Sequence, residues 1–252
     1  MPSLRLPLSP SLLLSFSLLL ALPPALRAAP ATHLFDGRTL AGWEGDLKWW
    51  RVQDGAVTGG STTEKVPKNS FLATTRSFQN FDLRLKLKLT GDPKTGMINS
   101  GVQIRSLRVP DHHEMSGYQV DAGDKWWGKL YDESRRNKVI AEPIDAAAAD
   151  AAVKRDDWND YRILAEGPRI RSWINGVPAL DYTETDPAIA LDGKVALQVH
   201  SGGMALVQFK DIAITELPPT PGAPTWDKVG HPKPRPPAKK KNALPATVPS
   251  AK

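Results

Sequence analysis

Residues 81–89 read FDLRLKLKL. Apolar and polar side chains alternate at every position of this stretch, which is the two-residue period of a β-strand that buries one of its faces. The apolar side chains would all lie on one side of the strand and face a core: Phe81, Leu83, Leu85, Leu87 and Leu89. This stretch therefore predicts a half-buried strand.

The same alternation recurs on both sides of this strand. WWRVQDGAVTG at 49–59 and RIRSWINGVPALDY at 169–182 each read as two strands joined by a tight turn, at Asp54-Gly55 and Asn175-Gly176. Only residues 145–154 predict a helix, and it is short. About ten strands with frequent turns predict an all-β fold, an antiparallel sandwich or barrel; the other alternating runs are 97–106, 117–122, 158–164, 194–200 and 204–214.

The two ends of the chain differ in composition from the rest. Residues 1–31 contain Arg5, then a leucine-rich run and then small residues, which is the order of a secretory signal peptide. Prolines interrupt the run, so a retained membrane anchor, which needs about 20 apolar residues, is the less favoured alternative. Residues 218–252 are rich in Pro and Lys and predict a disordered tail. We expect one domain, residues 32–217, in a protein that is exported to the periplasm or cell exterior without stable membrane insertion.

Charge and cysteine content exclude several classes of site. The chain carries a formal net charge of +6. Residues 218–252 contribute seven Lys and Arg against one acid, and residues 1–31 contribute two Arg, so residues 32–217 carry a net charge of −2. The basic character thus belongs to the ends, and nucleic acid is not expected as a partner. The absence of Cys excludes disulfides, thiolate catalysis and zinc–thiolate sites.

Several segments taken together resemble a known family. They are LFDGRTLAGWEG at 34–45, DGAVTGG at 54–60, NSGVQIRS at 99–106, GYQVDAGDKWWGKLYDESRRNK at 117–138 and ALQVHSGGMALVQFKDIAI at 196–214. In this order and spacing they are similar to the 3-keto-disaccharide hydrolase domain, which is common in exported proteins of bacteria that degrade polysaccharides. The resemblance covers residues 32–217. It implies a concanavalin-like antiparallel β-sandwich, or jelly roll, and an activity on glycosides oxidised to a ketone at C3.

A ketone at C3 makes a glycoside easier to cleave. It acidifies the C2–H bond, so a base can remove that proton, an enolate can form and the C1–O bond can break by elimination, after which water adds. Such a site needs a base near C2, a cationic or hydrogen-bonding cradle for the enolate oxygen, and a proton donor for the leaving sugar. The strand motif E-x-D-x-x-E of ordinary concanavalin-like glycosidases is absent, which argues against ordinary retaining hydrolysis.

Residues 117–138 contain charged groups of every kind that this chemistry needs. Asp121 and Glu133 are candidates for the base and the acid; the alternatives are a turn-capping Asp and a Glu in an ion pair. Arg135 and Arg136 are candidates for holding the oxyanion, although one of them is expected to be structural.

The same stretch supplies aromatic and amide side chains. Trp127 and Tyr131 are candidates for stacking on the sugar ring, and the adjacent Trp126 is then expected in the core. Gln119 is a candidate for substrate binding. We place it on the opposite face of its strand from Asp121, so that a bulge is needed for both to line one site.

Two further strands carry polar side chains on one face. In NSGVQIR, residues Asn99, Gln103 and Arg105 have the same parity and predict a ligand-binding face, with a solvated face as the alternative. The resemblance singles out this NSG-x-x-x-R run and implies a ligand-facing role for Arg105. In KVALQVH, Gln198 and His200 share a face, and His200 is either a base near neutral pH or a structural histidine beside a turn.

These residues favour an enzyme that cleaves 3-keto-glycosides or disaccharides by abstraction of the C2 proton, elimination and hydration. One alternative is a non-catalytic, lectin-like carbohydrate-binding module, which would need the same aromatics; another is an envelope protein anchored by its tail. Carbohydrate is the expected partner. No cofactor and no metal are expected, since His112 and His113 in the run PDHHEM give only a weak signal for a divalent ion.

Overall fold

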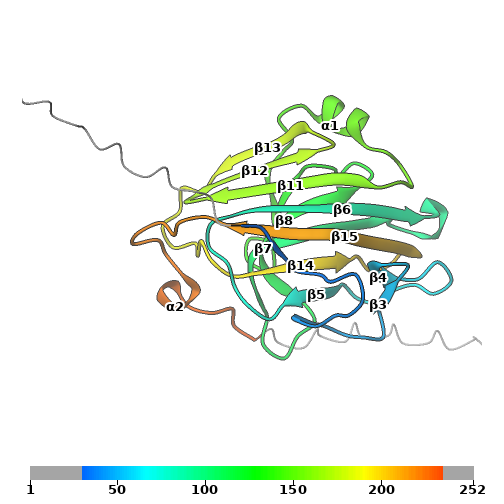
Figure 1. The fold of residues 1–252 in the computed structure, drawn as a ribbon, viewed down its shortest axis with the longest axis horizontal. Coiled ribbons are helices and arrows are strands. Elements are labelled where there is room, and N and C mark those ends of the chain that lie inside the picture. The colour runs from blue at the N-terminus through cyan, green and yellow to red at the C-terminus, as the bar shows by residue number, and fades with distance from the viewer. Residues whose placement is uncertain (1–29, 235–252) are drawn as a thin grey trace, which may run out of the picture.

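The computed structural model describes residues 30–234, and within them the fold is almost entirely β. One antiparallel sheet has eight strands (Figure 1), and its spatial order is β13 (Val177–Thr183), β12 (Arg169–Ile174), β11 (Asn159–Glu166), β6 (Phe81–Gly91), β15 (Ala205–Glu216), β4 (Ala56–Gly60) and β3 (Trp50–Gln53), with β1 (Thr32–His33) paired to β15. The second sheet has seven strands, in the order β10 (Lys138–Ala141), β9 (Leu130–Glu133), β8 (Met115–Gly123), β7 (Asn99–Arg108), β14 (Lys194–Val199), β5 (Ser70–Thr74) and β2 (Trp43–Glu44).

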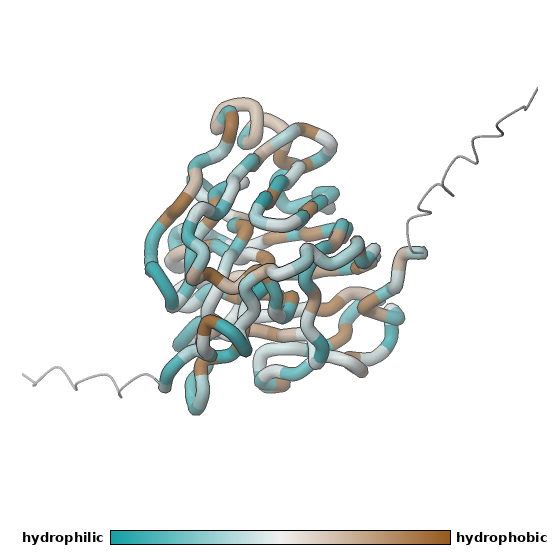
Figure 2. The backbone as a smooth tube through the Cα atoms, turned by 90° about the vertical axis from the view of Figure 1, so that its left-hand side faces the viewer, coloured by the Kyte–Doolittle hydropathy of each residue, from teal (hydrophilic) through white to brown (hydrophobic). Residues whose placement is uncertain are grey.

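The two sheets pack face to face around one core, which confirms the predicted concanavalin-like sandwich. The alternation of 81–89 is realised in β6, whose odd-numbered side chains are buried while the even-numbered ones lie outside. Facing them from the seven-stranded sheet are Val102, Ile104, Tyr118, Val120, Leu197 and Val199. Along the strands, hydrophobic and hydrophilic positions alternate in the same way (Figure 2). The Asp54-Gly55 and Asn175-Gly176 turns join β3 to β4 and β12 to β13, as predicted.

The structure has fifteen strands, where the sequence predicted about ten. The additional strands are short, and they carry no long alternating pattern: β1, β2, β5, β9 and β10. The predicted helix is present as α1 (Ala146–Ala152), and the Asp145 carboxylate caps it by accepting a hydrogen bond from Ala148 N at 2.9 Å. A 3-10 turn covers Pro93–Thr95.

A second helix, α2 (Trp226–Val229), lies in the segment that we expected to belong to a disordered tail. Trp226 is only 6% exposed, and its indole Nε1 donates to Arg105 O at 3.2 Å. The Trp226 amide also donates to Asp192 Oδ1 at 2.9 Å. The tail prediction is therefore corrected for residues 218–229: residues 218–226 pack on the domain, with Ala223 and Trp226 buried, and α2 continues the ordered segment to Val229. The predicted signal peptide, apart from residues 30–31, and residues 235–252 lie outside the described residues.

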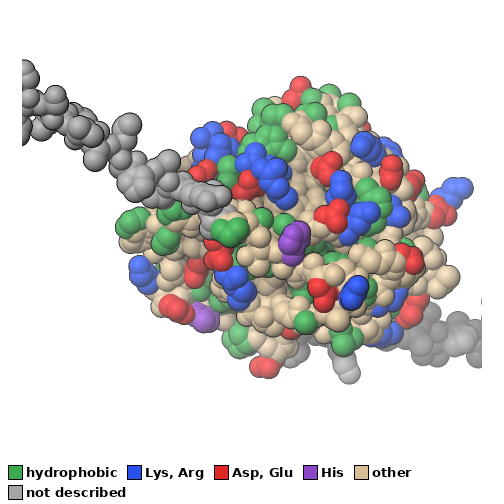
Figure 3. Space-filling model, viewed as in Figure 1, with side chains coloured by type: hydrophobic (Ala, Val, Ile, Leu, Met, Phe, Trp, Pro, Cys, Tyr) green, Lys and Arg blue, Asp and Glu red, His purple; other side chains and the backbone are tan. Residues whose placement is uncertain are grey.

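The outer face of the eight-stranded sheet is charged and largely self-neutralising. Arg162 donates to Asp82 at 2.9 Å and Lys86 donates to Asp160 at 2.6 Å, both across neighbouring strands. Acidic and basic side chains are accordingly intermixed on the face shown in Figure 3. Exposed pairs of this kind contribute about 0–1 kcal/mol each and give no sign of a site. Within residues 30–234, no helix is long and apolar enough to cross a membrane.

Candidate functional site

The outer face of the seven-stranded sheet carries a cavity of about 190 Å³, and it differs from the other outer face in that buried polar side chains form its floor. Strands β7, β8, β9 and β14 supply a buried polar floor, and half-exposed or exposed side chains from the adjoining loops form the mouth. The lining residues are Asn69, Met97, Asn99, Gln119, Asp121, Trp126, Tyr131, Glu133, Gln198 and His200.

Strand register brings these residues together. Gly101 of β7 lies opposite Asp121 of β8 on one side and opposite Gln198 of β14 on the other. A Cβ atom at Gly101 would lie 2.6 Å from Gln119 Cγ, so only glycine leaves room for the Gln119 side chain to lie across the strand. The absence of a side chain at this central position opens the floor of the cavity.

A chain of buried hydrogen bonds orients the floor. Ser106 Oγ donates to Gln103 Oε1 at 2.6 Å, and Gln103 Nε2 donates to Gln119 Oε1 at 3.0 Å. Gln119 Nε2 then donates to Asp121 Oδ1 at 2.6 Å and to Gln198 Oε1 at 3.2 Å. The amides in this series orient one another, and the series holds the Asp121 carboxyl in position.

Asp121 is buried with only part of its hydrogen-bonding capacity used. Within residues 30–234, neither Asp121 Oδ2 nor Gln198 Nε2 has a hydrogen-bond partner. Burial, together with the nearby negative charge of Glu133, raises the pKa of the Asp121 carboxyl well above its ordinary value, although the bond from Gln119 opposes the shift. A raised pKa favours the protonated form of this carboxyl, which can donate a proton.

His200 lies at the mouth of the same cavity, half-buried at the end of β14. Its Nδ1 lies 2.7 Å from Ser201 O. A carbonyl oxygen can only accept, so Nδ1 carries the hydrogen, and in the neutral ring Nε2 is left as a proton acceptor. Asp121 is therefore the candidate proton donor of this cavity, and His200 Nε2 is the candidate proton acceptor.

The mouth also carries aromatic side chains. The Trp126 and Tyr131 rings stand edge to face with centroids 6.3 Å apart, and Lys129 Nζ lies 5.4 Å from the Trp126 centroid. Burial, with the charges of Glu133 and Asp121, raises the pKa of the Tyr131 hydroxyl, so that it stays protonated and able to donate a hydrogen bond. A polar floor below aromatic walls suits a sugar ring, which has apolar faces and hydroxyl edges.

Seven of the twelve predicted site residues line the cavity: Asn99, Gln119, Asp121, Tyr131, Glu133, Gln198 and His200. Gln103 lies behind them and holds Gln119. The expectation that Gln119 and Asp121 lie on opposite faces was wrong, because residues two apart on the regular strand β8 share a face.

Trp127 does not line the cavity, and the choice between the two tryptophans is reversed. Trp127 is 7% exposed in the hydrophobic core, with its ring 6.3 Å from that of Tyr161. Residues 124–129 form turns after β8, in which Trp126 N and Trp127 N both donate to Gly123 O. The alternation of faces along a strand does not apply in such a turn, so the sequence offered no basis for choosing between Trp126 and Trp127 as the residue at the cavity.

Arg105 also lies away from the cavity, contrary to prediction. A β-bulge between Ile104 and Leu107 and a φ of +50° at Arg105 break the alternation that places Gln103 on the outer face. The buried guanidinium instead donates to Gln79 O at 2.8 Å, Gly167 O at 2.7 Å and Asn80 Oδ1 at 3.0 Å. Burial lowers its pKa to about 10, but it remains charged at neutral pH and ties three segments of backbone together.

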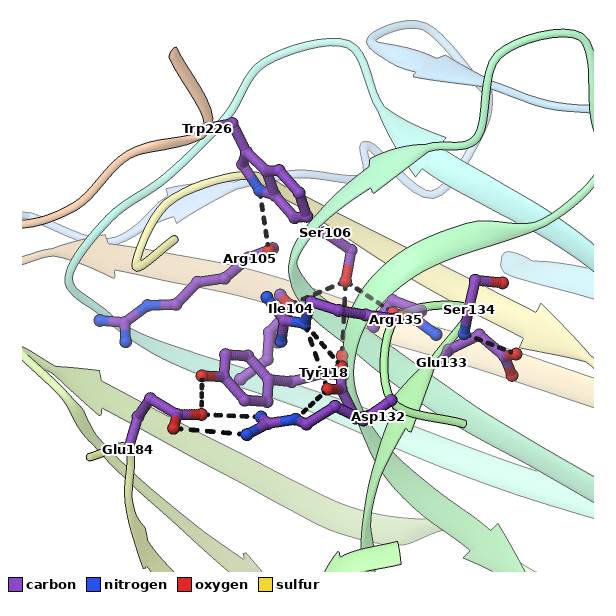
Figure 4. Close-up of polar contacts among 12 residues, drawn as sticks. Ile104, Arg105, Ser106, Tyr118, Asp132, Glu133, Ser134, Arg135, Glu184 and Trp226 are labelled. Atoms are coloured by element: carbon purple, nitrogen blue, oxygen red, sulfur yellow. Dashed lines mark hydrogen bonds and ion pairs between the residues drawn. The ribbon is translucent and has the colours of Figure 1, made fainter. Parts of the chain in front are cut away.

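Arg135 and Arg136 point into a second group of charges on the inner side of the sheet (Figure 4). Arg135 Nε donates to Asp132 Oδ1 at 2.9 Å, and Arg136 donates both to Asp132 and, at 2.7 Å, to Glu184 Oε2. Glu133 points away from this group (Figure 4). Neither arginine lines the cavity, and the predicted oxyanion-holding role is not supported by their positions.

Sequence reasoning missed three residues at the mouth: Asn69, Met97 and Trp126. Asn69 and Met97 lie in loops, where no periodic pattern marks an inward-facing side chain. Among residues 30–234, no group of three or more His, Asp and Glu side chains is placed to hold a metal ion.

Three solved structures show where this fold occurs. A Parabacteroides distasonis protein provisionally classed as a glycosyl hydrolase is 20% identical, with a TM-score of 0.54 over 75% of this chain and 94% of its own. A carbohydrate-binding module from Bacillus subtilis is 16% identical, with a TM-score of 0.50 over 69% and 96%. The laminarinase of Rhodothermus marinus is 10% identical, with a TM-score of 0.51 over 75% and 96%. The fold is thus one that carbohydrate-active and carbohydrate-binding proteins use.

No curated protein sequence matches the chain significantly. The sequence does match the family described as the 3-keto-alpha-glucoside-1,2-lyase-like domain, over residues 30–215. That range holds every residue that lines the cavity. Because the match covers most of its length, the chain belongs to the 3-keto-alpha-glucoside-1,2-lyase-like domain family.

Proposed function

We propose that the protein cleaves 3-keto-glycosides, with the keto sugar in the cavity of about 190 Å³ and its ring against Trp126 and Tyr131. The observation that carries the proposal is that one cavity contains both a buried carboxyl with a raised pKa, Asp121, and an imidazole, His200, whose Nδ1 is bonded to Ser201 O and whose Nε2 is left to accept a proton. The reaction needs one group that accepts a proton and one that donates it. The match to the lyase-like family supports the same reaction class.

In the proposed first step, His200 Nε2 takes the C2 proton and the electron pair moves into the C3 carbonyl to form an enolate. Side-chain amides of the floor, Asn99 and Gln198, are available to donate hydrogen bonds to the enolate oxygen. The enolate then collapses to a C1–C2 double bond as the C1–O bond breaks, and Asp121 gives its proton to the departing oxygen. The products of this half-reaction are the free leaving group and an unsaturated 3-keto sugar.

The second half-reaction restores the enzyme. The Asp121 carboxylate takes a proton from water as its oxygen adds to C1, and the His200 imidazolium returns a proton to C2. The product is the free 3-keto sugar, and both residues regain their starting protonation states. Without the second half-reaction the protein would act as a lyase and release the unsaturated sugar.

A non-catalytic carbohydrate-binding role is the second candidate, since the solved binding module from Bacillus subtilis shares the fold. Aromatic walls would serve that role equally well. A binding module has no use, however, for a buried carboxyl whose raised pKa and unpaired oxygen reduce stability. This difference favours the enzyme. We also propose export to the periplasm or cell exterior, on the composition of residues 1–31.

The test is incubation of the purified protein with a 3-keto aryl glucoside and with 3-keto-trehalose, beside the unoxidised glycosides. We expect release from the oxidised substrates only, and a loss of about 10²- to 10⁴-fold in kcat for His200→Gln and for Asp121→Asn. The exposed residues His33 and Asp124 provide matched controls, His33→Gln and Asp124→Asn, which should retain activity. Binding of glycans without release from either oxidised substrate would establish the binding module instead.

A further inference from the structure

A second and larger cavity lies beside the one already described, and no role has yet been given to it. Its volume is about 690 Å³. Trp49 and Phe71 form part of its wall, and Lys68, Arg108 and His112 bring polar groups to it. Trp49 and Phe71 are buried, whereas Lys68 is exposed and His112 half-buried.

The two cavities adjoin at Asn69, which lines both. Their floors are also neighbours, because Phe71 of β5 lies directly opposite Gln198 of β14. Asn69 is held in place by bonds to two different loops: its Oδ1 accepts from Ser201 N at 3.0 Å and its backbone oxygen lies 3.0 Å from His113 Nδ1. The boundary between the two cavities is therefore a fixed side chain, with one cavity on each side of it.

The wall of the larger cavity is rigid where it is charged. Arg108 Nε donates to Glu44 Oε1 at 3.1 Å, and its two terminal nitrogens donate to the backbone oxygens of His113 and Phe71 at 3.3 and 3.2 Å. This arginine is committed to the fold. The rest of the wall carries the carboxylates of Glu44, Asp46 and Asp111 beside Lys68, two histidines and the Trp49 and Phe71 rings. Carboxylates and other hydrogen-bonding groups beside apolar rings suit the hydroxyl edges and apolar faces of sugars.

We infer that the larger cavity holds the leaving part of the substrate and that this part contains more than one sugar. The inference rests on the function proposed for the neighbouring cavity. The reacting sugar ring must lie between Asp121 and His200 in the smaller cavity. This ring fills that cavity, so the leaving group attached at C1 must lie elsewhere. The larger cavity, with more than three times the volume, accepts at least two further rings. The substrate class is then an oligosaccharide whose terminal residue carries the C3 ketone.

The experiment uses one series of 3-keto-glucosides whose leaving groups are a nitrophenol, a glucose, a glucose disaccharide and a glucose trisaccharide. We expect kcat/KM to rise about tenfold between the one-sugar and the two-sugar leaving groups, chiefly through KM, because one or two additional hydrogen bonds and ring contacts form. His112→Ala and Lys68→Ala should remove most of this gain while cleavage of the aryl glycoside stays at the wild-type rate. Lys65→Ala is the matched control, since Lys65 is exposed in the same loop but does not line the cavity.

Failure of this inference can be told apart from failure of the proposed function. Cleavage of the aryl glycoside with no gain along the series, or with a gain that both variants retain, would overturn the inference and leave the proposed reaction intact. If no substrate is cleaved, calorimetric titration with the unoxidised oligosaccharides tests whether the second cavity binds sugars. Tighter binding of three sugars than of one, weakened by His112→Ala but not by Lys65→Ala, would support the second cavity as a sugar site; equal affinities would overturn it.

Discussion

Asp132 and Glu133 are neighbours in the sequence but belong to two groups of buried charges on opposite sides of one sheet. On the inner side, all the carboxylate oxygens of Asp132 and Glu184 accept hydrogen bonds, from Arg135, Arg136, two tyrosine hydroxyls and backbone amides. On the outer side, and within residues 30–234, Asp121 accepts from Gln119 alone and keeps one oxygen unpaired. Arg135 Nη1 and Nη2 also lack a partner there, so the contrast lies in the carboxylates: those of the inner group are fully bonded and hold the fold together, whereas Asp121 keeps an oxygen that can bind and react.

One carboxyl from each group, Glu184 and Asp121, has a shifted pKa, and the two shifts have opposite directions. Burial alone would raise the pKa of Glu184, but bonds from Arg136, Tyr118 and Tyr182 outweigh it and lower the pKa to about 2. Its contribution to stability is therefore present above its ordinary pKa and lost as the pH falls toward 2. The pKa of Asp121 is raised, so its contribution is present at acid pH and lost as the pH rises above its ordinary value. For these two buried carboxyls, the number of hydrogen bonds to the charged form, more than burial, decides whether the pKa is lowered or raised.

The largest expected effect separates the two adjacent tryptophans. Trp127→Ala should lower the free energy of unfolding by about 3–5 kcal/mol, because it leaves a hole in the core between the sheets. Trp126→Ala should change stability by less than about 1 kcal/mol and instead raise the KM for the 3-keto-glycoside, because it removes a wall of the cavity. Urea denaturation and steady-state kinetics measure the two effects. Equal destabilisation by the two variants would contradict the assignment of Trp126 to the mouth.

The second effect tests the inner group. Glu184→Gln should lower the free energy of unfolding at neutral pH by about 3 kcal/mol, because it removes the charge that faces Arg136. The difference in the free energy of unfolding between variant and wild type should shrink as the pH falls toward 2, because Glu184 of the wild type then also becomes uncharged. Chemical denaturation at a series of pH values measures this. The control is Glu166→Gln, which breaks the more exposed pair with Arg171 and should cost less than about 1 kcal/mol. A difference that is independent of pH would show that packing, not charge, makes Glu184 important.

Strand periodicity predicted a sandwich or barrel, and the family resemblance selected the sandwich. Periodicity also placed Asn99 on a polar face and Gln198 with His200 on another, and these residues meet because β7 and β14 are neighbours in the sheet. Asp121 was chosen for its carboxyl, and the face of Gln119 relative to Asp121 was predicted wrongly. Prediction failed where the backbone leaves that regularity. The bulge at Arg105, the turn at Trp126 and the loop at Asn69 each redirect a side chain by backbone geometry that residue type does not encode. Arg135 and Arg136 were assigned to the cavity by their charge alone. Arg136 instead binds Glu184, which lies 48 residues away in the sequence.

A smaller effect tests the outer group through stability. Asp121→Asn keeps the size of the side chain and the oxygen that accepts from Gln119, but it removes the need to protonate or bury a charge at neutral pH. We expect a rise of a few degrees in Tm at pH 7, since about 1 kcal/mol corresponds to roughly 2–4 °C at this chain length. The rise should shrink as the pH falls and disappear well below the ordinary pKa of 3.8, where the wild-type carboxyl is protonated in both the folded and the unfolded states. A lower Tm at pH 7 would mean that Asp121 is a structural carboxylate; the exposed control Asp124→Asn should leave Tm unchanged.

The smallest expected effect is a shift in a pH profile, and it tests whether the outer group works as a unit. The charge of Glu133 is one of the causes that raise the pKa of Asp121, so Glu133→Gln should lower that pKa. In the proposed reaction, cleavage requires protonated Asp121, so kcat should fall as the pH rises through its pKa. In the variant this fall should begin at a lower pH. The maximal rate should decline much less than in Asp121→Asn, because Glu133 acts through Asp121 and does not itself transfer the proton. The exposed residue Glu142 offers the control Glu142→Gln, whose profile should match the wild type. The Glu133→Gln variant could instead show an unchanged fall of kcat at alkaline pH together with a maximal kcat as low as that of Asp121→Asn. That result would assign the proton transfer to Glu133 in place of Asp121.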